Sequence, residues 1–495
     1  MTAPTETIRS LAGYLEQWLA HQGSLGRVPG IQAAVRVGEE VVLNTAWGVA
    51  DVSTGTELTT EHLFRIASHS KTFTGTAIMQ LVEAGSVRLD DRLQAHIPEL
   101  AGAPIGEVTV REALGHQGGI IRDGKVKDFW QRLMPFPDRQ GLLAMARDEA
   151  LTFGRNEHFK YSNVAYALLG LVIETAAGTS YDDYVRTRII DVLGLTNTGP
   201  EYDPDRHRDF VLGHTGLLHG DDVREPIEHV DSRAFGAATG FYSTAADMTT
   251  YGAAHFHGDD ALLSDDSKRL MQRLESVLEG PGIPEARYGV GMSLRRLGDR
   301  DLVGHSGGYP GHITRTYIDP TDQIVVSVLT NAIDGPADAL AAGIFRLIDL
   351  ALDPPAHVQH AGDQRPTSPT DTARATSAVE PSRDAGRDTA AARYTGRFAG
   401  LWGISDIVDL GGHLYLLNPA QANPTESYLH LRPVDADTAR IQSTSGFGSV
   451  GELVHYERDD DGTIVSLRLA GGRAWPVAEF LARRAALARG RLPQD

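Results

Sequence analysis

Hydrophobic and polar positions along the first hundred residues follow two different periods. Apolar residues at helical spacing over 8–19 predict an amphipathic helix, and a second apolar stripe over 73–82 predicts a helix that ends at Gly85. Between them, residues 31–37 and 41–47 alternate apolar and small side chains around a short turn. This alternation predicts a β-hairpin that comes before the second helix.

The pattern from residue 86 to residue 352 is mixed. Four segments have helical periodicity, namely 110–114, 139–147, 164–177 and 181–193, and a closing helix is predicted over 336–352. Ser243 or Thr244 is a candidate N-cap with Asp247 in the first turn. Short strands are predicted at 289–292, 302–305, 313–318 and 324–330. Strands at both ends and helices between them indicate an α+β domain, with one antiparallel sheet flanked by helices and a helical subdomain.

Composition changes sharply after residue 353. Residues 354–390 are rich in Pro, Ser, Thr, Ala, Asp and Arg and almost free of large apolar side chains, which is typical of a flexible linker. From 391 to 495 short alternating runs are separated by glycine turns, which predicts a small all-β sandwich or barrel. The sequence therefore divides into 1–353, a linker at 354–390, and 391–495. The basic tail is interpreted as a solvated helix end; it contains Arg483, Arg484, Arg489 and Arg491.

Charge and composition exclude several classes of protein. The chain of 495 residues has a net charge of −19, which argues against general nucleic-acid binding. It has no cysteine, so disulfides, thiol nucleophiles and thiolate metal sites are excluded. Its histidines form no close ligand cluster, and we expect no metal and no cofactor. We see neither a signal peptide nor a run of roughly 18 apolar residues, so we expect a cytoplasmic protein with no membrane span. The oligomeric state is not indicated.

The helix at 73–82 carries the first candidate chemistry at its start. Ser68 lies three residues before Lys71, so the hydroxyl and the amine share one helix face and can approach hydrogen-bonding distance. A neutral serine is a poor nucleophile and needs a base. Lysine can be that base only if its pKa falls, which burial and nearby positive potential can cause.

Two further segments carry candidate groups. Tyr161 and Asn163 lie just before an apolar helix; a phenol near a lysine ammonium loses its proton more easily, and an asparagine can bond both Lys71 and a substrate. The third segment, Gly304 to Gly311, contains His305 and several glycines, which often mark the close approach of a ligand to a strand. An edge N–H here and the N–H of Ser68 can together form an oxyanion hole.

The ordered set Ser68/Lys71, Tyr161/Asn163 and His305/Gly307 resembles the class C β-lactamase and penicillin-binding-protein superfamily of serine hydrolases. The resemblance covers roughly residues 5–352 and includes the segments Phe64–Ser68, Leu89–Asp91, Leu114–Ile120 and Gly240–Thr244. It implies that Ser68 is acylated, that Lys71 and Tyr161 share the proton transfers, and that Asn163 orients the substrate and Lys71. It also implies that the N–H groups of Ser68 and Gly308 hold the oxyanion, with His305, Gly307 and Gly308 binding substrate.

The sequence departs from that family at His305, where β-lactamases and carboxypeptidases have lysine in a Lys-Thr-Gly triplet. Histidine with an ordinary pKa is mostly neutral near pH 7, so recognition of a substrate carboxylate there is in doubt. The His-x-Gly form resembles D-aminopeptidases, D-amino-acid amidases and related esterases. The linker with a C-terminal barrel is similar to members that have a lipocalin-like domain.

Three functions remain open on the sequence. The first is a serine hydrolase that cleaves an ester or amide, including D-amino-acid peptides and amides, through an acyl-enzyme on Ser68. The second is an acyltransferase or peptide cyclase, resembling penicillin-binding-protein-type thioesterases, in which an amine accepts the acyl group. The third is a non-catalytic binding protein. Each would bind a small-molecule or peptide ligand.

Overall fold

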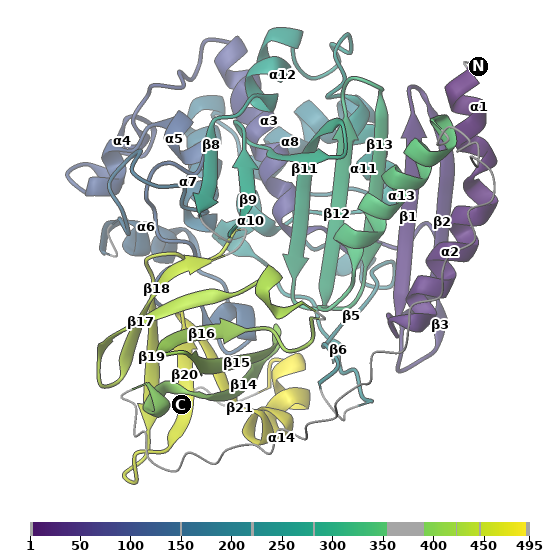
Figure 1. Cartoon of the computed structure of the whole chain (residues 1–495). Coiled ribbons are helices and arrows are strands. Elements are labelled where there is room, and N and C mark those ends of the chain that lie inside the picture. The colour runs from purple at the N-terminus through teal and green to yellow at the C-terminus, as the bar shows by residue number, and fades with distance from the viewer. Residues whose placement is uncertain are drawn as a thin grey trace, which may run out of the picture.

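The computed structural model describes residues 3–148, 151–218, 222–280, 283–353, 391–421, 423–444 and 447–491. It consists of a layered α+β body and a closed β-barrel that lies against one end of it (Figure 1). The predicted linker at 354–390 lies outside the described residues.

A nine-stranded antiparallel sheet forms the centre of the first body. Its spatial order is β3-β2-β1-β13-β12-β11-β10-β9-β8, so strands from both ends of the segment meet at the β1–β13 pair. The strands are β1 (Gly30–Val37), β2 (Glu40–Asp51), β3 (Thr56–Glu57), β8 (Ser276–Gly280), β9 (Ile283–Tyr288), β10 (Ser293–Leu297), β11 (Arg300–Tyr309), β12 (His312–Asp319) and β13 (Ile324–Thr330). This confirms the predicted α+β class.

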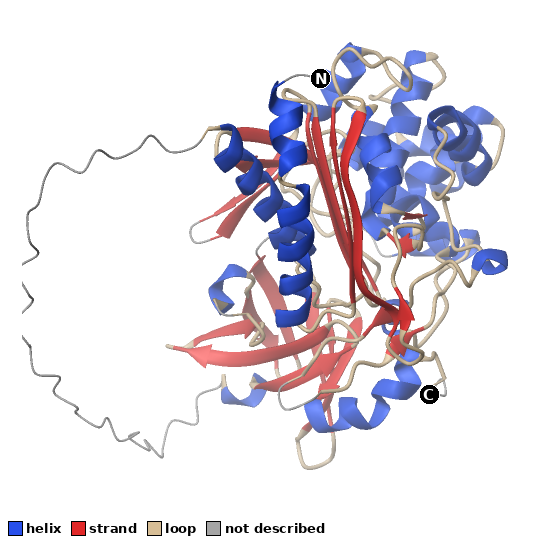
Figure 2. Cartoon of the chain, turned by 90° about the vertical axis from the view of Figure 1, so that its right-hand side faces the viewer, coloured by secondary structure: helices blue, strands red, loops and turns tan. Residues whose placement is uncertain are grey.

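The sheet is covered by helices on both faces, as the edge-on view in Figure 2 shows. Along β13, Val326 and Val328 belong to one apolar cluster while Val325 and Leu329 belong to another, because successive side chains of a strand point to opposite faces. The first cluster is closed by α1 (Ala3–Ser10), α2 (Ala12–Leu25) and α13 (Ala337–Leu352).

The other face carries the helical region that holds the candidate site. Its helices are α3 (Ser70–Glu83), α4 (Leu93–His96), α5 (Val110–Leu114), α6 (Arg139–Asp148), α7 (Asn163–Ala177), α8 (Tyr181–Val185), α9 (Asp191–Leu193), α10 (Gly236–Thr239), α11 (Ala245–Ala253) and α12 (Asp265–Gln272). Two short strand pairs link them, β4 (Phe64–Arg65) with β7 (Tyr242–Ser243) and β5 (Gly213–His214) with β6 (Pro226–Ile227). As predicted, Thr244 caps α11 by accepting the backbone N–H of Asp247.

The C-terminal body is an eight-stranded barrel in which each strand pairs with the next and the last closes on the first. Its strands are β14 (Gly396–Gly400), β15 (Gly403–Leu410), β16 (His413–Leu417), β17 (Leu429–Asp435), β18 (Thr438–Thr444), β19 (Leu453–Arg458), β20 (Ile464–Leu469) and β21 (Gly472–Pro476). An apolar cluster that includes Phe398, Leu416 and Tyr456 fills the interior. Of the sandwich and barrel alternatives, the barrel is correct.

Three local predictions were wrong. The first predicted helix is two helices that meet at Leu11, where the Ser10 hydroxyl donates to the carbonyl of Thr7 and competes with the helical pattern. Residues 289–292 form a turn between β9 and β10, because the N–H of Val290 bonds Met271 and not a neighbouring strand. The prediction of a solvated basic tail is wrong for Arg484, which is only 7% exposed on α14 (Val477–Ala488), and correct for Arg489 and Arg491, which are exposed.

No single helix in the described part of the chain is long and apolar enough to cross a membrane, while α7 together with the segment Tyr181–Leu193 passes the same test as a pair bent by 78°.

Candidate active site

The loop before α3 presents Ser68 from a strained turn. Strand β4 leads into a 3-10 turn, Ala67–His69, in which Ala67 has a φ of 48° in the left-handed region. That conformation costs an L-residue roughly 1–2 kcal/mol, so neighbouring contacts must hold it. The Ser70 hydroxyl does so, since it donates to the Ala67 carbonyl at 2.5 Å and accepts the N–H of Phe241 at 3.0 Å. Ser68 therefore stands at the N-terminal end of α3, as the sequence predicted.

Lys71 has three hydrogen-bonding partners around its amine. Its Nζ lies 3.0 Å from Ser68 Oγ, 2.6 Å from Asn163 Oδ1 and 2.8 Å from the carbonyl of Ala238. The latter two groups can only accept, so they use two N–H bonds of the amine. In a neutral amine the remaining lone pair faces the Ser68 hydroxyl. Burial, reinforced by Arg122 and opposed by Asp123, holds the pKa of Lys71 well below its usual value. These contacts suit Lys71 to act as the base.

Asp123 fixes the orientation of Asn163. The Asn163 amide donates through Nδ2 to Asp123 Oδ1 at 2.6 Å, so its Oδ1 must face Lys71. Asp123 is buried and also accepts the indole N–H of Trp130 at 3.0 Å. The sequence assigned the Asn163 amide to both Lys71 and substrate. Its nitrogen, however, already donates to the Asp123 carboxylate.

We predict that Asp123→Asn shifts the acidic limb of kcat/KM to lower pH. Asp123 raises the pKa of Lys71, so its removal leaves the amine neutral at lower pH. The limb falls where Lys71 becomes protonated, and its midpoint follows that pKa. A pH–rate profile on a neutral substrate checks this, and a shift toward higher pH would contradict it.

Tyr161 lies beside Ser68 and Lys71, but its predicted ionisation is wrong. Burial raises the pKa of its phenol above the ordinary value. The hydrogen bond with Ser68 and the charge of Arg122 lower this pKa, but only in part. The ring is enclosed by Lys71, whose Nζ is 4.9 Å from its centroid, and by Phe447, which stacks on it at 4.9 Å. The free site therefore holds a neutral phenol, which is a proton donor.

Strand β11 lies directly against the Ser68 turn. A Cβ on Gly307 would come within 2.1 Å of the Ile66 carbonyl, so only glycine permits this approach. Ser306 and Gly308 line the cavity in front of Ser68, whereas His305 and Gly307 do not. Gly308 therefore lines the same cavity as Ser68, and its role as an oxyanion donor stays a prediction.

His305 faces away from the cavity, so the structure does not support direct contact with substrate. It is 1% exposed; its Nε2 lies 3.0 Å from the Tyr288 hydroxyl and its Nδ1 2.6 Å from the Ser306 carbonyl. Because a carbonyl only accepts, Nδ1 carries the proton and Nε2 accepts from Tyr288. Burial holds the pKa of His305 well below its ordinary value, so the side chain is neutral.

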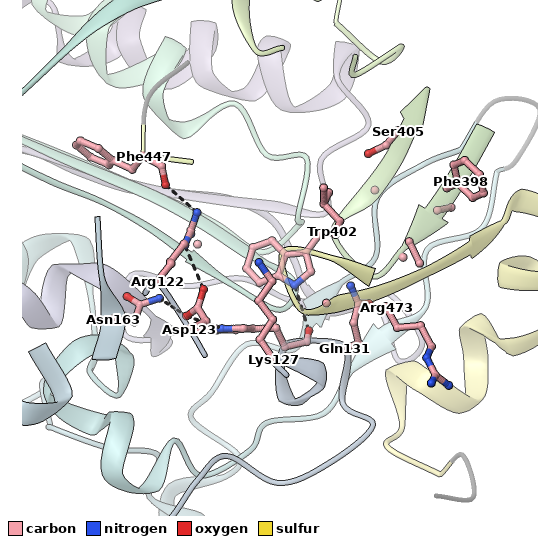
Figure 3. A pocket seen from close by; sticks show the side chains of 18 of the residues that line it. Arg122, Asp123, Lys127, Gln131, Asn163, Phe398, Trp402, Ser405, Phe447 and Arg473 are labelled. Carbon is pink, nitrogen blue, oxygen red and sulfur yellow. Dashed lines mark hydrogen bonds and ion pairs between the residues drawn. The ribbon is translucent and has the colours of Figure 1, made fainter. Parts of the chain in front are cut away.

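A cavity of about 390 Å³ opens in front of Ser68 between the two bodies (Figure 3). The α+β body contributes Ser68, Arg122, Asp123, Lys127, Trp130, Gln131, Tyr161, Asn163, Ser306 and Gly308. The barrel contributes Phe398, Ala399, Gly400, Trp402, Gly403, Ser405, Phe447, Leu469, Gly472, Arg473 and Ala474. The barrel therefore forms one wall of the candidate active site.

The hairpin between β14 and β15 docks on the segment that follows Asp123. Trp402 donates its indole N–H to the Trp130 carbonyl at 3.1 Å, and Gln131 Oε1 accepts the Leu401 N–H at 2.8 Å. A Cβ on Gly308 would lie 3.3 Å from the Trp402 ring, so this tryptophan covers the cavity beside Gly308 of β11.

A buried ion pair joins the barrel to the residue before Tyr161. Lys160 and Glu452 have side chains that are 1% and 5% exposed, and the Lys160 amine bonds the Glu452 carboxylate. The same carboxylate accepts the backbone N–H of Arg122 at 3.1 Å, and the Arg122 side chain donates to the Phe447 carbonyl at 2.7 Å. The barrel thus contacts both segments that carry Asp123 and Tyr161.

Sequence reasoning missed Asp123, Lys127, Trp130, Trp402 and Phe447. The charged residues at 122–128 come soon after the glycines at 115–119, and this combination was a usable signal for a segment at the site. No comparable local signal marks Trp402 or Phe447, which reach the site only because the barrel docks there.

Comparisons with known proteins agree with this geometry. The family model described as Beta-lactamase matches residues 15–351. Penicillin-binding protein 4 of Amycolatopsis lactamdurans is 29% identical over 64% of this chain and 84% of that protein. D-aminopeptidase of Brucella anthropi is 26% identical over 67% of this chain, and the match spans 61% of that enzyme.

Two solved structures resemble the fold. The octameric penicillin-binding protein homologue from Pyrococcus abyssi has a TM-score of 0.62 at 22% identity, covering 93% of this chain and 99% of that one. D-amino acid amidase from Ochrobactrum anthropi SV3, complexed with D-phenylalanine, has a TM-score of 0.56 at 25% identity, covering 71% and 98%. Since the family match covers more than half of its length, the chain belongs to the β-lactamase family of serine hydrolases and penicillin-binding proteins, here followed by an eight-stranded barrel.

Proposed function

We propose that this protein hydrolyses an ester or amide bond through an acyl-enzyme on Ser68. The observation that carries the proposal is the set of three contacts around Lys71, which leaves its lone pair facing the Ser68 hydroxyl. Ser68 Oγ attacks the carbonyl and its proton passes to Lys71. The Tyr161 phenol protonates the leaving group and regains a proton from Lys71. Water then attacks the acyl-enzyme, with the same groups acting in reverse order.

The proposed substrates are small esters, amides and peptides, with D-amino-acid derivatives as the first class to test. Two similarities support this choice, since one relative is named a D-aminopeptidase and one solved structure is a D-amino acid amidase. The buried His305 supports the same choice, because it is neutral at the position on β11 where carboxypeptidases have a lysine.

We predict weak turnover of penicillins and cephalosporins. Their carboxylate would need a cation beside β11, and His305 is neutral and turned away from the cavity. Loss of one buried charge-assisted hydrogen bond costs roughly 2–4 kcal/mol, or about 30- to 1,000-fold in kcat/KM. Nitrocefin hydrolysis compared with a p-nitrophenyl ester checks this; nitrocefin turnover equal to that of the ester would show the prediction to be wrong.

Transfer to an amine is the second candidate, and the barrel wall of the cavity favours it. The barrel wall restricts the space around the acyl-enzyme, so a bound amine can compete with water there. Intact-mass spectrometry and turnover with p-nitrophenyl esters and with D- and L-amino-acid p-nitroanilides, with and without an added amine, separate the cases. Hydrolysed product supports the hydrolase, and product conjugated to the amine supports the transferase. No Ser68 adduct with any of these substrates would remove the support for both and favour a binding protein.

A further inference from the structure

The lining of the cavity is positive although the chain as a whole is strongly acidic. Among the described residues that line it, Arg122, Lys127 and Arg473 carry cations and Asp123 is the one carboxylate, against a net charge of −19 for the chain. Low-dielectric walls concentrate such a local field. The cavity therefore attracts a group of charge opposite to that of its lining.

Both oxygens of Asp123 already have partners within the protein. Its carboxylate bonds the Asn163 amide at 2.6 Å and the Trp130 indole at 3.0 Å, and it pairs with Arg122 at 3.1 Å. A substrate ammonium would therefore meet three cations and a carboxylate that is already shared among three donors.

Lys127 differs from the two arginines. Arg122 pairs with Asp123, and Arg473 lies 3.6 Å from Glu457. Like Asp123, the other two carboxylates that influence Lys127 are bonded elsewhere: Asp128 binds Arg468 at 2.6 Å, and Glu452 binds Lys160. Within the ranges that the structure describes, the Lys127 amine has no hydrogen bond and no carboxylate within ion-pair distance.

The barrel directs this amine into the cavity. The backbone N–H of Lys127 donates to the Gly471 carbonyl at 3.0 Å. A Cβ on Gly472 would lie 3.0 Å from Lys127 Cε, so the glycine leaves room for the lysine side chain. Figure 3 shows the side chain among Asp123, Gln131 and Trp402. The pKa of Lys127 is lower than its ordinary value, because burial outweighs the charges of Asp123 and Glu452, which raise it. A bound anion would satisfy the amine that the fold leaves without a partner.

We propose that Lys127 is the centre of an anion subsite, and that the preferred substrate carries a carboxylate or another anionic group near the scissile bond. The inference rests on the proposed function and narrows its substrate class, since it favours acyl donors with an anionic group over D-aminoacyl amides with a free ammonium. It also means that the cation that binds the substrate anion lies on the segment after Asp123 and not on β11, where His305 is neutral.

Binding to the full-length Ser68→Ala protein tests the subsite independently of turnover. The probes are p-nitrophenyl hemisuccinate, its methyl ester, 3-acetoxybenzoic acid and its methyl ester, which place the charge on the acyl or the leaving-group side. We expect the charged member of at least one pair to bind 10-fold or more tightly than its ester, by calorimetry at low salt, and this preference to shrink as salt is added. Equal binding of both members in both pairs, or no binding of any probe, would overturn the proposal.

Substitutions assign the effect to Lys127. In the Ser68→Ala background, Lys127→Gln should remove the preference and Lys127→Arg should restore most of it. Lys125→Gln, an exposed lysine on the same segment that does not line this cavity, is the matched control and should keep it. A preference that survives in Lys127→Gln would also overturn the proposal. If no ester acylated Ser68 in the wild-type protein while the binding preference remained, that result would count against the proposed hydrolase and not against the anion subsite.

Discussion

Ser68→Ala is expected to abolish the acyl-enzyme and to lower kcat by about 10⁴-fold or more, the scale seen when a serine nucleophile is removed. The hydroxyl is the one group toward which the Lys71 lone pair is directed, and Ala238 and Asn163 already occupy the N–H bonds of the amine. Intact-mass spectrometry should therefore show no adduct with an ester that labels the wild-type protein.

The control for this result is the second serine of the same turn. Ser70 lies in the helix, and its hydroxyl bonds Ala67 and Phe241 and does not line the cavity. Ser70→Ala should still form the adduct, with lower thermal stability because the strained Ala67 loses a contact. Unchanged turnover in Ser68→Ala, or an adduct that disappears in Ser70→Ala alone, would place the nucleophile elsewhere.

The second large effect is expected for Glu452→Gln, which should lower the free energy of unfolding by about 3–5 kcal/mol, the usual cost of leaving a buried charge without its partner. Glutamine keeps an acceptor for the Arg122 N–H but removes the charge that neutralises Lys160. Urea unfolding of the full chain measures the change. Because Lys160 is next to Tyr161, the rate of acylation of Ser68 should fall as well.

Two variants separate this ion pair from general damage to the barrel. Glu457→Gln removes a carboxylate whose side chain is 41% exposed, and should cost less than about 1 kcal/mol. Lys160→Met combined with Glu452→Gln removes both charges but keeps the acceptor for the Arg122 N–H, and should recover most of the lost stability because no buried cation is left without its partner. A single Glu452→Gln variant as stable as the wild type would show that the stability of the fold does not depend on the Lys160–Glu452 ion pair.

The site residues that could be predicted from the sequence are those close together along the chain or at the start of a helix. Ser68 and Lys71 are three residues apart at the start of one helix, and Asn163 is the first residue of α7, capped by Ser162. Such positions follow from helix geometry, so they could be predicted without knowledge of the packing. Strands β1, β2, β11, β12 and β13 of the central sheet were likewise predictable from their alternation, whereas β3, β8, β9 and β10 were not predicted.

The rest of the site depends on contacts between distant segments. Phe447 stacks on Tyr161 and Trp402 bonds Trp130 across hundreds of residues, and no local pattern encodes where the barrel docks. The direction of His305 is a second example. Its neutral state was predictable from its residue type, but whether it or Ser306 faces the cavity depends on the register of β11 against the Ser68 turn.

The sequence position of Glu452 also determines when the protein becomes complete during its synthesis. Lys160 leaves the ribosome 292 residues before the carboxylate that neutralises it, an interval of about 15–60 s at ordinary elongation rates. Throughout that time the segment of Tyr161 has an unneutralised cation, and the cavity lacks the wall that β14 and β21 later provide. A nascent chain therefore contains Ser68 and Lys71 long before it contains a finished site.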